Sequence, residues 1–357
     1  WGSYVRYIGA GAIATGGIIS LIKSMPLIVT TFRDSMKSMK GSKNTSDART
    51  AQDLPMSAVL IGIVAMIVII WLVPAIPVNI LGAVLIVVFG FFFATVSSRM
   101  VGLIGSSNNP VSGMAIATLL IATITIKATG DSGITGMMGA IAIGSVICII
   151  AAIAGDTSQD LKTGFLLGAT PKKQQIGELI GVVASGLAIG GVLYLLNAAW
   201  GYGGAEVPAP QATLMKMIVE GIMGGELPWT LVFIGVFLAI GLEILRIPVM
   251  PFAIGLYLPI YLNAGIMVGG VVRMFMDGRK NVDAKTKEKQ STDGTLYCAG
   301  MIAGEGLVGI LLAILAVCGV SMDLSGSLNL GNIGGIGLLV VMVLCLLRFS
   351  LWKKSKN

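Results

Sequence analysis

The chain of 357 residues is 55% hydrophobic and only 11% charged, and its mean hydropathy is +0.91. Because a soluble domain carries roughly 25% charged residues, this composition excludes a soluble globular protein. The sequence contains no histidine, which excludes histidine-based triads and HExxH zinc chemistry. Its four cysteines lie in apolar runs without metal-ligand spacing. The sequence therefore predicts no metal site, no cofactor and no enzyme.

Ten apolar runs follow one another along the chain, and several reach the ~20 residues with which a helix crosses the hydrocarbon core. They are continuous rather than alternating, which indicates helices and not barrel strands. We predict an all-α polytopic membrane protein, a single transmembrane domain over residues 1–357 with about ten transmembrane segments. The segments are expected at residues 7–32, 56–74, 79–97, 111–128, 133–154, 176–196, 229–245, 247–276, 295–318 and 333–349.

Lysine and arginine gather in four connecting regions, which are residues 33–55, 155–175, 277–294 and the C-terminal tail. The positive-inside rule places all four in the cytoplasm of a cell (inner) membrane protein. Residues 33–55 and 277–294 are then cytoplasmic linkers, and the C-terminus is cytoplasmic. This placement accounts for the net charge of +7 without a nucleic-acid partner.

The run 247–276 begins and ends at cytoplasmic connections, so a single crossing does not fit it. Pro251, Pro259 and Gly265 are helix breakers within it. Backbone that is not helical survives at membrane depth only beside protein or a water-filled cavity. The sequence therefore predicts broken helices with a re-entrant hairpin near a cavity, and one long tilted helix is the alternative.

The external segment 197–228 carries one lysine, Lys216, and two prolines that precede an apolar pattern. This pattern is typical of a short amphipathic helix at the membrane interface, or of a cap over an external vestibule. Small residues at four-residue spacing elsewhere predict closely packed helices. They form three stripes, Gly136–Ala140–Gly144, Gly177–Gly181–Ser185 and Gly300–Gly304.

The stretch "SSRMVGLIGSSNNPVSGM" at 97–114 is polar although both of its flanks are apolar. Pro110 lacks an N–H and disfavours helix at Asn109, so the chain should unwind there. Transporters with discontinuous helices bind substrates at such breaks, and ordinary turn chemistry explains the same residues. If the helix is broken, the substrate path is lined by Arg99, Asn108, Asn109, Pro110, Ser112 and Gly113.

A second polar stretch, "AGDTSQDLKTGFLLGATPKKQQIGELIG" at 154–181, follows. Asp156 and Asp160 are spaced to share a helical face, with Lys162 beside them, so the three form a candidate gate or binding patch. A solvated loop with a salt bridge is the simpler interpretation. Thr170 and Pro171 predict a helix start.

Three carboxylates occur inside apolar runs, where ionisable groups are costly and usually functional. Glu305 lies between Gly304 and Gly306 near the middle of its run and is the first candidate for proton coupling. Glu178 is the second candidate. Glu243 is the third, although an ion pair with Arg246 explains it more simply.

These stretches resemble the oligopeptide transporter family, in particular its prokaryotic branch, which is related to the yellow-stripe-like metal-chelate transporters. The resemblance also extends to "YIGAGAIATGGIISLIKSMPLIV" at 7–29, "PAPQATLM" at 208–215 and "FAIGLYLPIYLNAGIMVGGVVR" at 252–273. It implies a proton-coupled symporter for small oligopeptides or peptide-like metal chelates.

Family members have more spans than are expected here. The chain is therefore expected to be a C-terminal portion that works with N-terminal helices of the same polypeptide, in the lipid bilayer, as a monomer or a homo-oligomer. Two other classes of membrane protein compete with this interpretation. A passive channel would need a filter-like repeat, which is not visible. An intramembrane aspartyl protease would need a second embedded aspartate.

Overall fold

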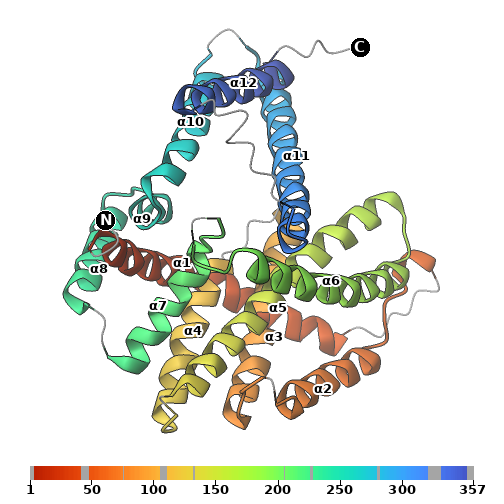
Figure 1. Cartoon of the computed structure of the whole chain (residues 1–357). Helices are drawn as coiled ribbons and strands as arrows, with labels where there is room; N and C mark the ends of the chain where they lie inside the picture. The colour runs from red at the N-terminus through yellow and green to blue at the C-terminus, as the bar shows by residue number, and fades with distance from the viewer. Residues whose placement is uncertain are drawn as a thin grey trace. The chain divides into compact units, whose positions relative to one another are not determined.

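The computed structural model describes residues 4–41, 48–74, 76–104, 111–131, 133–204, 206–225, 228–279, 282–320 and 331–351. These residues form twelve α-helices and one short 3-10 helix, and they form no β-strand (Figure 1). Seven of the described helices are long and apolar enough to cross a membrane. The prediction of an all-α polytopic chain is therefore confirmed, and the finer count of about ten spans stays a prediction.

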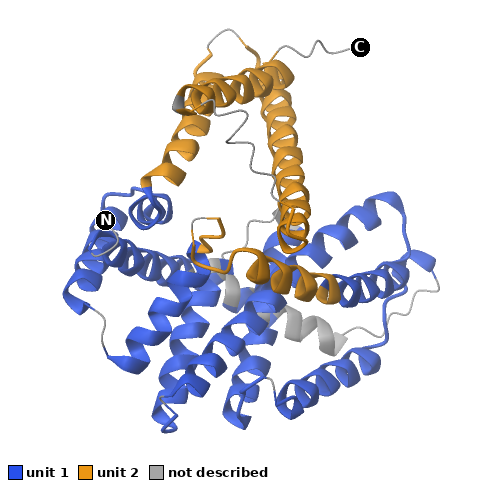
Figure 2. Ribbon diagram, in the orientation of Figure 1, with its two compact units in different colours: residues 1–185, 210–259 blue, residues 186–209, 260–357 orange. Residues whose placement is uncertain are grey.

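The chain divides into two compact units, residues 1–185 with 210–259 and residues 186–209 with 260–357 (Figure 2). Helix α6, Pro171–Ala199, begins in the first unit and ends in the second. The other helices of the first unit are α1 Val5–Gly41, α2 Met56–Leu72, α3 Ile80–Ile104, α4 Val111–Ala128, α5 Ile134–Leu167, α7 Pro210–Gly224, α8 Trp229–Ile244 and α9 Val249–Tyr257. The second unit contains α10 Ile260–Asp277, α11 Ala284–Val317 and α12 Gly331–Leu351.

Two clusters of buried apolar side chains hold the first unit together. One joins α3, α4 and α5 around Phe93 and Ile143. The other joins α1, α4, α8 and α9 around Ile13 and Tyr257. Helix α7, the short helix expected within 197–228, contributes to both clusters, because Val219 lies in the first and Leu214 in the second. The apolar side of α7 therefore packs on protein, and its position at the membrane interface stays a prediction.

Close backbone contact fixes α1 against α8 and α9. A Cβ atom on Gly11 would meet the carbonyl of Val232, and one on Gly235 would meet the carbonyl of Ile8. A Cβ on Gly9 would lie 2.6 Å from the backbone nitrogen of Tyr257. Only glycine allows helices to approach so closely, as expected where lipid supplies no hydrophobic force between helices.

The predicted small-residue stripes have different outcomes. Ala140 is buried on α5, and a Cβ on Gly144 would meet the side chain of Leu119 on α4 at 3.1 Å, so the first stripe is packed. Nothing that the structure describes lies within 4 Å of a Cβ built on the glycines of the other two stripes. Their packing stays a prediction.

Four helices, α1, α3, α5 and α11, extend well beyond their predicted segments, since α1 continues from 32 to Gly41 and α11 begins at Ala284 rather than at 295. Helix α3 continues from the expected end at 97 to Ile104, and α5 continues from 154 to Leu167. Arg99 and the stretch "GDTSQDLKTG" are thus helical, so the interpretation of that stretch as a loop is wrong. Helix α5 ends at Leu167, and the next residue, Gly168, has a φ of 72° and forms the left-handed C-cap that glycine favours. The expected start of α6 at Pro171 is confirmed.

The run 247–276 is broken at one of the three predicted breakers, Pro259, whereas Pro251 and Gly265 lie within α9 and α10. Helix α9 ends at Tyr257 and α10 begins at Ile260, with Pro259 in the gap. Proline removes a backbone donor and disfavours helix at the preceding residue. Because α9 belongs to the first unit and α10 to the second, the re-entrant hairpin itself stays a prediction.

The end of α9 is tied to two other helices through one hydroxyl. Tyr257 donates to the carbonyl oxygen of Pro210 at 2.7 Å and accepts from Nη2 of Arg6 at 3.2 Å. The Arg6 guanidinium also lies 5.3 Å from the centroid of the Tyr257 ring. This buried tyrosine therefore holds α1, α7 and α9 together immediately before the break.

We expect Gly235→Ala to lower the melting temperature of the purified protein, since the added methyl meets the backbone of α1. Overpacking of this kind costs about 1–3 kcal/mol. Gly241→Ala is the matched control on the same helix, because its Cβ has no described neighbour within 4 Å. Equal melting temperatures for the two variants would contradict the backbone contact between α1 and α8.

Candidate functional site

Serine side chains join α3 to α5 at the polar stretch that the sequence singles out. The Ser97 hydroxyl, which is fully buried, donates to the carbonyl oxygen of Ala151. The hydroxyl of the next residue, Ser98, lies 2.7 Å from that of Ser158, which is seven residues after Ala151 on α5. Hydrogen bonds between helices satisfy polar groups that lipid would leave unpaired. Ser97 and Ser98 thus serve the contact between α3 and α5.

Carboxyl groups meet where α5 turns into α6. Glu178, nearly two turns into α6, contacts the Thr157 side chain of α5 and interacts electrostatically with Asp160. Its Oε1 atom is buried without a hydrogen-bond partner among the described residues. The Gln174 amide donates to the Asp160 carbonyl oxygen at 3.0 Å. We name Thr157, Asp160, Gln174 and Glu178 the carboxyl corner.

A short segment, residues 49–54, docks on the turn between α5 and α6 and on the start of α6, and we call it the strap. Arg49 donates to the Thr170 hydroxyl at 2.9 Å and to the Gly168 carbonyl at 2.8 Å. The Lys172 amide donates to the Gln52 carbonyl at 2.8 Å. The last part of the predicted linker 33–55 is therefore bound to the α5–α6 turn.

Gln175 of α6 completes the docking of the strap. Its Oε1 accepts from the Leu54 amide at 2.8 Å, and its Nε2 donates to Asp53 Oδ1 at 3.3 Å. The strap thus uses backbone and side-chain groups on both sides, and it covers the beginning of the helix that carries Glu178.

The predicted patch of Asp156, Asp160 and Lys162 is only partly assembled. All three residues are exposed on α5. The two aspartates share a helical face, and Asp160 faces Glu178, as described above. Among the described residues, no ion pair joins Lys162 to either aspartate. Asp160 therefore interacts with Glu178 rather than with Lys162.

The predicted break around Asn108, Asn109 and Pro110 lies outside the described residues. The side chain of Ser112 is likewise not described. Arg99 is half-buried on α3. Gly113 is buried at the start of α4, where a Cβ would lie 2.7 Å from the Gly17 carbonyl oxygen of α1. The structure thus gives Gly113 a packing contact between α4 and α1.

The other two carboxylates lie elsewhere. Glu243 of α8 forms an ion pair with Lys23 of α1. The expected pair with Arg246 is wrong, because the partner comes from a helix far away in sequence. Glu305 is exposed on α11 in the second unit. No group of three metal-ligating side chains occurs among the described residues.

Sequence reasoning missed the partners of Glu178. Thr157 and Gln174 were within the quoted stretch, but interpreting residues 155–175 as a loop hid their spacing. In a helix, Thr157 and Asp160 are three residues apart and face the same neighbour. That spacing, together with the absence of proline between residues 134 and 170, was the signal in the sequence that predicts a continuous helix.

Long apolar helices with polar seams between them define a multi-pass helical membrane protein. The family described as OPT oligopeptide transporter protein matches residues 1–316. The chain therefore belongs to the oligopeptide transporter family, which the sequence resemblance had indicated. This is a family of transporters and not of enzymes, in agreement with the expectation from the sequence.

Individual relatives agree with this assignment. A Haemophilus influenzae protein described as a candidate oligopeptide transporter is 33% identical over 94% of this chain and 61% of its own length. A protein of Oryza sativa subsp. japonica described as a probable metal-nicotianamine transporter is 27% identical over 56% of this chain and 31% of its own. An Arabidopsis thaliana protein described in the same way is 28% identical over 56% of this chain and 30% of its own length. The chain thus spans about three-fifths of the bacterial relative's length. No solved structure matches the chain.

We expect Arg49→Gln to release the strap, because the variant loses hydrogen bonds from a charged donor to Thr170 and Gly168. Hydrogen exchange at the Leu54 and Lys172 amides should become about tenfold faster, since such bonds to partly exposed groups contribute on the order of 1 kcal/mol. Lys173→Gln is the control, as that exposed side chain forms no hydrogen bond to a described residue. Unchanged exchange in Arg49→Gln would show that Arg49 does not hold the strap.

Proposed function

We propose that this chain takes part in proton-coupled symport of small oligopeptides or peptide-like metal chelates across the cell inner membrane. Membership of the oligopeptide transporter family supports transport as the activity. The relatives supply the two substrate classes, since one is described as an oligopeptide transporter candidate and others as probable metal-nicotianamine transporters.

The carboxyl corner is the observation that carries proton coupling. Asp160 and Glu178 come from different helices and interact by charge, so protonation of either group changes the field at the other. One Glu178 oxygen is buried without a hydrogen-bond partner among the described residues. A buried carboxyl oxygen in this state is a suitable place to take up a proton. Proton uptake would remove the charge between the ends of α5 and α6.

The proposed substrate path runs beside this corner. We propose that the wall of this path includes Arg99, residues 108–113, and the exposed Asp156 and Lys162 of the candidate gate. The support is positional, because α3 is joined to α5 through Ser98 and Ser158, one residue before Arg99 and two after Asp156. The amide groups of Asn108 and Asn109 would supply neutral hydrogen bonds to a peptide backbone or a chelate.

The topology proposed from the charges also has support. In the second unit the end of α10, the start of α11 and the end of α12 meet through the Ser350 hydrogen bond to the Gln290 carbonyl. The contact between linker 277–294 and the end of α12 supports our proposal that the linker and the C-terminal tail both face the cytoplasm. We further propose ten spans with a re-entrant hairpin at 247–276 that act together with further helices of the same polypeptide, singly or as a homo-oligomer.

A passive channel is the second candidate function. It would conduct without proton coupling, so the carboxyl corner favours the symporter. Accumulation of cargo against its gradient, driven by an imposed pH difference, distinguishes the two. An aspartyl protease is no longer a candidate, since the family consists of transporters.

We expect Glu178→Gln in the full-length transporter to abolish the acid stimulation of uptake into proteoliposomes, because glutamine keeps the shape of the side chain but cannot take up a proton. Asp160→Asn should reduce the stimulation in part. Glu220→Gln is the control, since that exposed carboxylate pairs with Lys216 at 3.6 Å on the short helix α7. A pH profile of Glu178→Gln identical to that of the unmodified protein would exclude the corner from proton coupling.

Glu305 is the other proposed proton carrier, because a carboxyl group between two glycines in the apolar part of α11 is open to water or cargo from either side. Glu305→Gln is expected to abolish acid-stimulated uptake while leaving the melting temperature unchanged. Uptake equal to that of the unmodified protein at every pH would remove Glu305 from the mechanism.

A further inference from the structure

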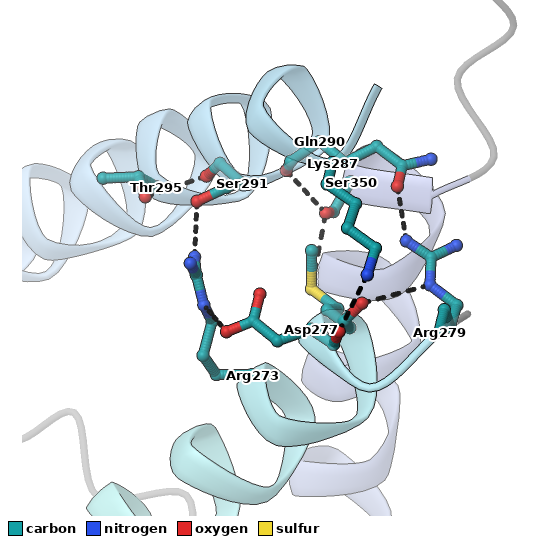
Figure 3. A network of polar contacts seen from close by, with 9 residues as sticks. Arg273, Asp277, Arg279, Lys287, Gln290, Ser291, Thr295 and Ser350 are labelled. Atoms are coloured by element: carbon teal, nitrogen blue, oxygen red, sulfur yellow. Dashed lines mark hydrogen bonds and ion pairs between the residues drawn. The ribbon is translucent and has the colours of Figure 1, made fainter. Parts of the chain in front are cut away.

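Three helix ends meet in the second unit and are held in place by a polar network (Figure 3). The Ser350 hydroxyl of α12 donates to the Gln290 carbonyl oxygen of α11 at 2.9 Å and lies 3.6 Å from the Met276 sulfur of α10. The Tyr297 and Phe349 rings stack with centroids 4.9 Å apart. The network therefore sits on a defined three-helix support.

Two cations of the network bind Asp277, one through its carboxylate and one through its backbone carbonyl. Arg273 donates through Nε to Asp277 at 2.8 Å and through Nη1 to the Ser291 hydroxyl. The Lys287 ammonium donates to the backbone carbonyl of Asp277 at 3.0 Å, so it does not neutralise the carboxylate. The positive charge here exceeds the negative charge.

A third cation lies on the other side of the same turn, as Figure 3 shows. Arg279 donates through Nη2 to the Gln290 side chain and through Nε to the Met276 carbonyl at 3.4 Å. A guanidinium group carries five N–H donors. With respect to the described residues, Arg273 and Arg279 each retain N–H groups for another acceptor.

The depth of this network follows from the length of α11. Its 34 residues extend about 51 Å, which exceeds the ~30 Å hydrocarbon core. Its first ten residues, 284–293, are almost all polar, and the first large apolar residue is Leu296. Gln290 and Ser291 precede Leu296 by five to six residues, or about 8–9 Å along the helix. The arginines bonded to them are therefore at the level of the lipid headgroups.

Exposed apolar side chains lie close to the cations in sequence, on the same two helices. Met274 and Phe275 on α10 are 70% and 59% exposed, and Leu296 on α11 is 65% exposed. Cations at headgroup level, with exposed apolar side chains on the same helices, match the two ends of a phospholipid, its phosphate and the upper part of its acyl chains.

We propose that Arg273, Arg279 and Lys287 form a binding site for the phosphate group of an anionic phospholipid. The guanidinium groups donate to the phosphate oxygens, and Lys287 adds a third positive charge. Free phosphate has the same headgroup chemistry but no acyl chains to contact Met274, Phe275 and Leu296. These exposed apolar side chains therefore favour the lipid over the soluble anion.

The test measures thermal unfolding of the purified full chain in detergent micelles, titrated with phosphatidylglycerol, phosphatidylcholine or inorganic phosphate. Phosphatidylglycerol should raise the melting temperature, and the other two should leave it nearly unchanged. Arg279→Gln should bind phosphatidylglycerol about fivefold more weakly, the loss expected for one cation near an anionic surface. Arg279→Lys, which keeps the charge, should retain most of the binding.

Lys216→Gln on α7 is the matched control and should bind phosphatidylglycerol like the unmodified chain. For each variant, the melting-temperature shift with phosphatidylglycerol is compared with the shift with phosphatidylcholine. A general loss of stability affects both measurements equally. Equal melting-temperature shifts with both lipids would overturn the proposal. A full phosphatidylglycerol shift in the triple variant Arg273→Gln, Arg279→Gln, Lys287→Gln would overturn it as well. A shift produced by inorganic phosphate alone would overturn the assignment of the site to lipid.

Discussion

A bilayer interior supplies no water to satisfy a polar group, so each polar group there must find a partner in the protein. This constraint explains the seam between α3 and α5. Ser97 is fully buried and bonds to the Ala151 carbonyl, and Ser98 bonds to Ser158. The same constraint makes Glu178 exceptional, because one of its oxygens finds no such partner among the described residues. Polar groups that are satisfied hold helices together, and an unsatisfied one is a candidate for chemistry.

Close backbone contact at glycine is the second kind of interaction that holds these helices together. Where α1 crosses α8, α9 and α4, glycines at 9, 11, 113 and 235 bring backbone directly against backbone. Such contacts have no freedom to adjust, because no flexible side chain lies between the helices. The first unit therefore combines rigid crossings around α1 with a polar corner at the ends of α5 and α6.

Signals that are local in sequence predicted the structure well. The start of α6 at Pro171 and the break at Pro259 both follow from the fixed φ of proline and its missing N–H. The ends of α3 and α5 were placed too early, because hydropathy cannot recognise polar residues whose partners lie on another helix. Ser97 continues a helix since Ala151 is beside it, 54 residues away in sequence.

Side-chain pairing was the least predictable feature. Spacing suggested Arg246 as the partner of Glu243, yet the ion pair forms with Lys23 of α1. Arg246 has a φ of 58°, in the turn that follows α8, so helical spacing no longer applies to it. The carboxyl corner also depends on the reversal of direction at Gly168, which brings residues 157 and 178 together. Site residues that meet through a turn need the geometry of that turn.

Helix α6 has one more property that matters for the working molecule. It carries Glu178 near its beginning and continues without interruption for 29 residues, about 43 Å, into the other compact unit. An unbroken ladder of backbone hydrogen bonds makes such a helix stiff along its axis. If Glu178 takes up a proton as proposed, the charge changes on the first turns of the same continuous helix that ends at Ala199.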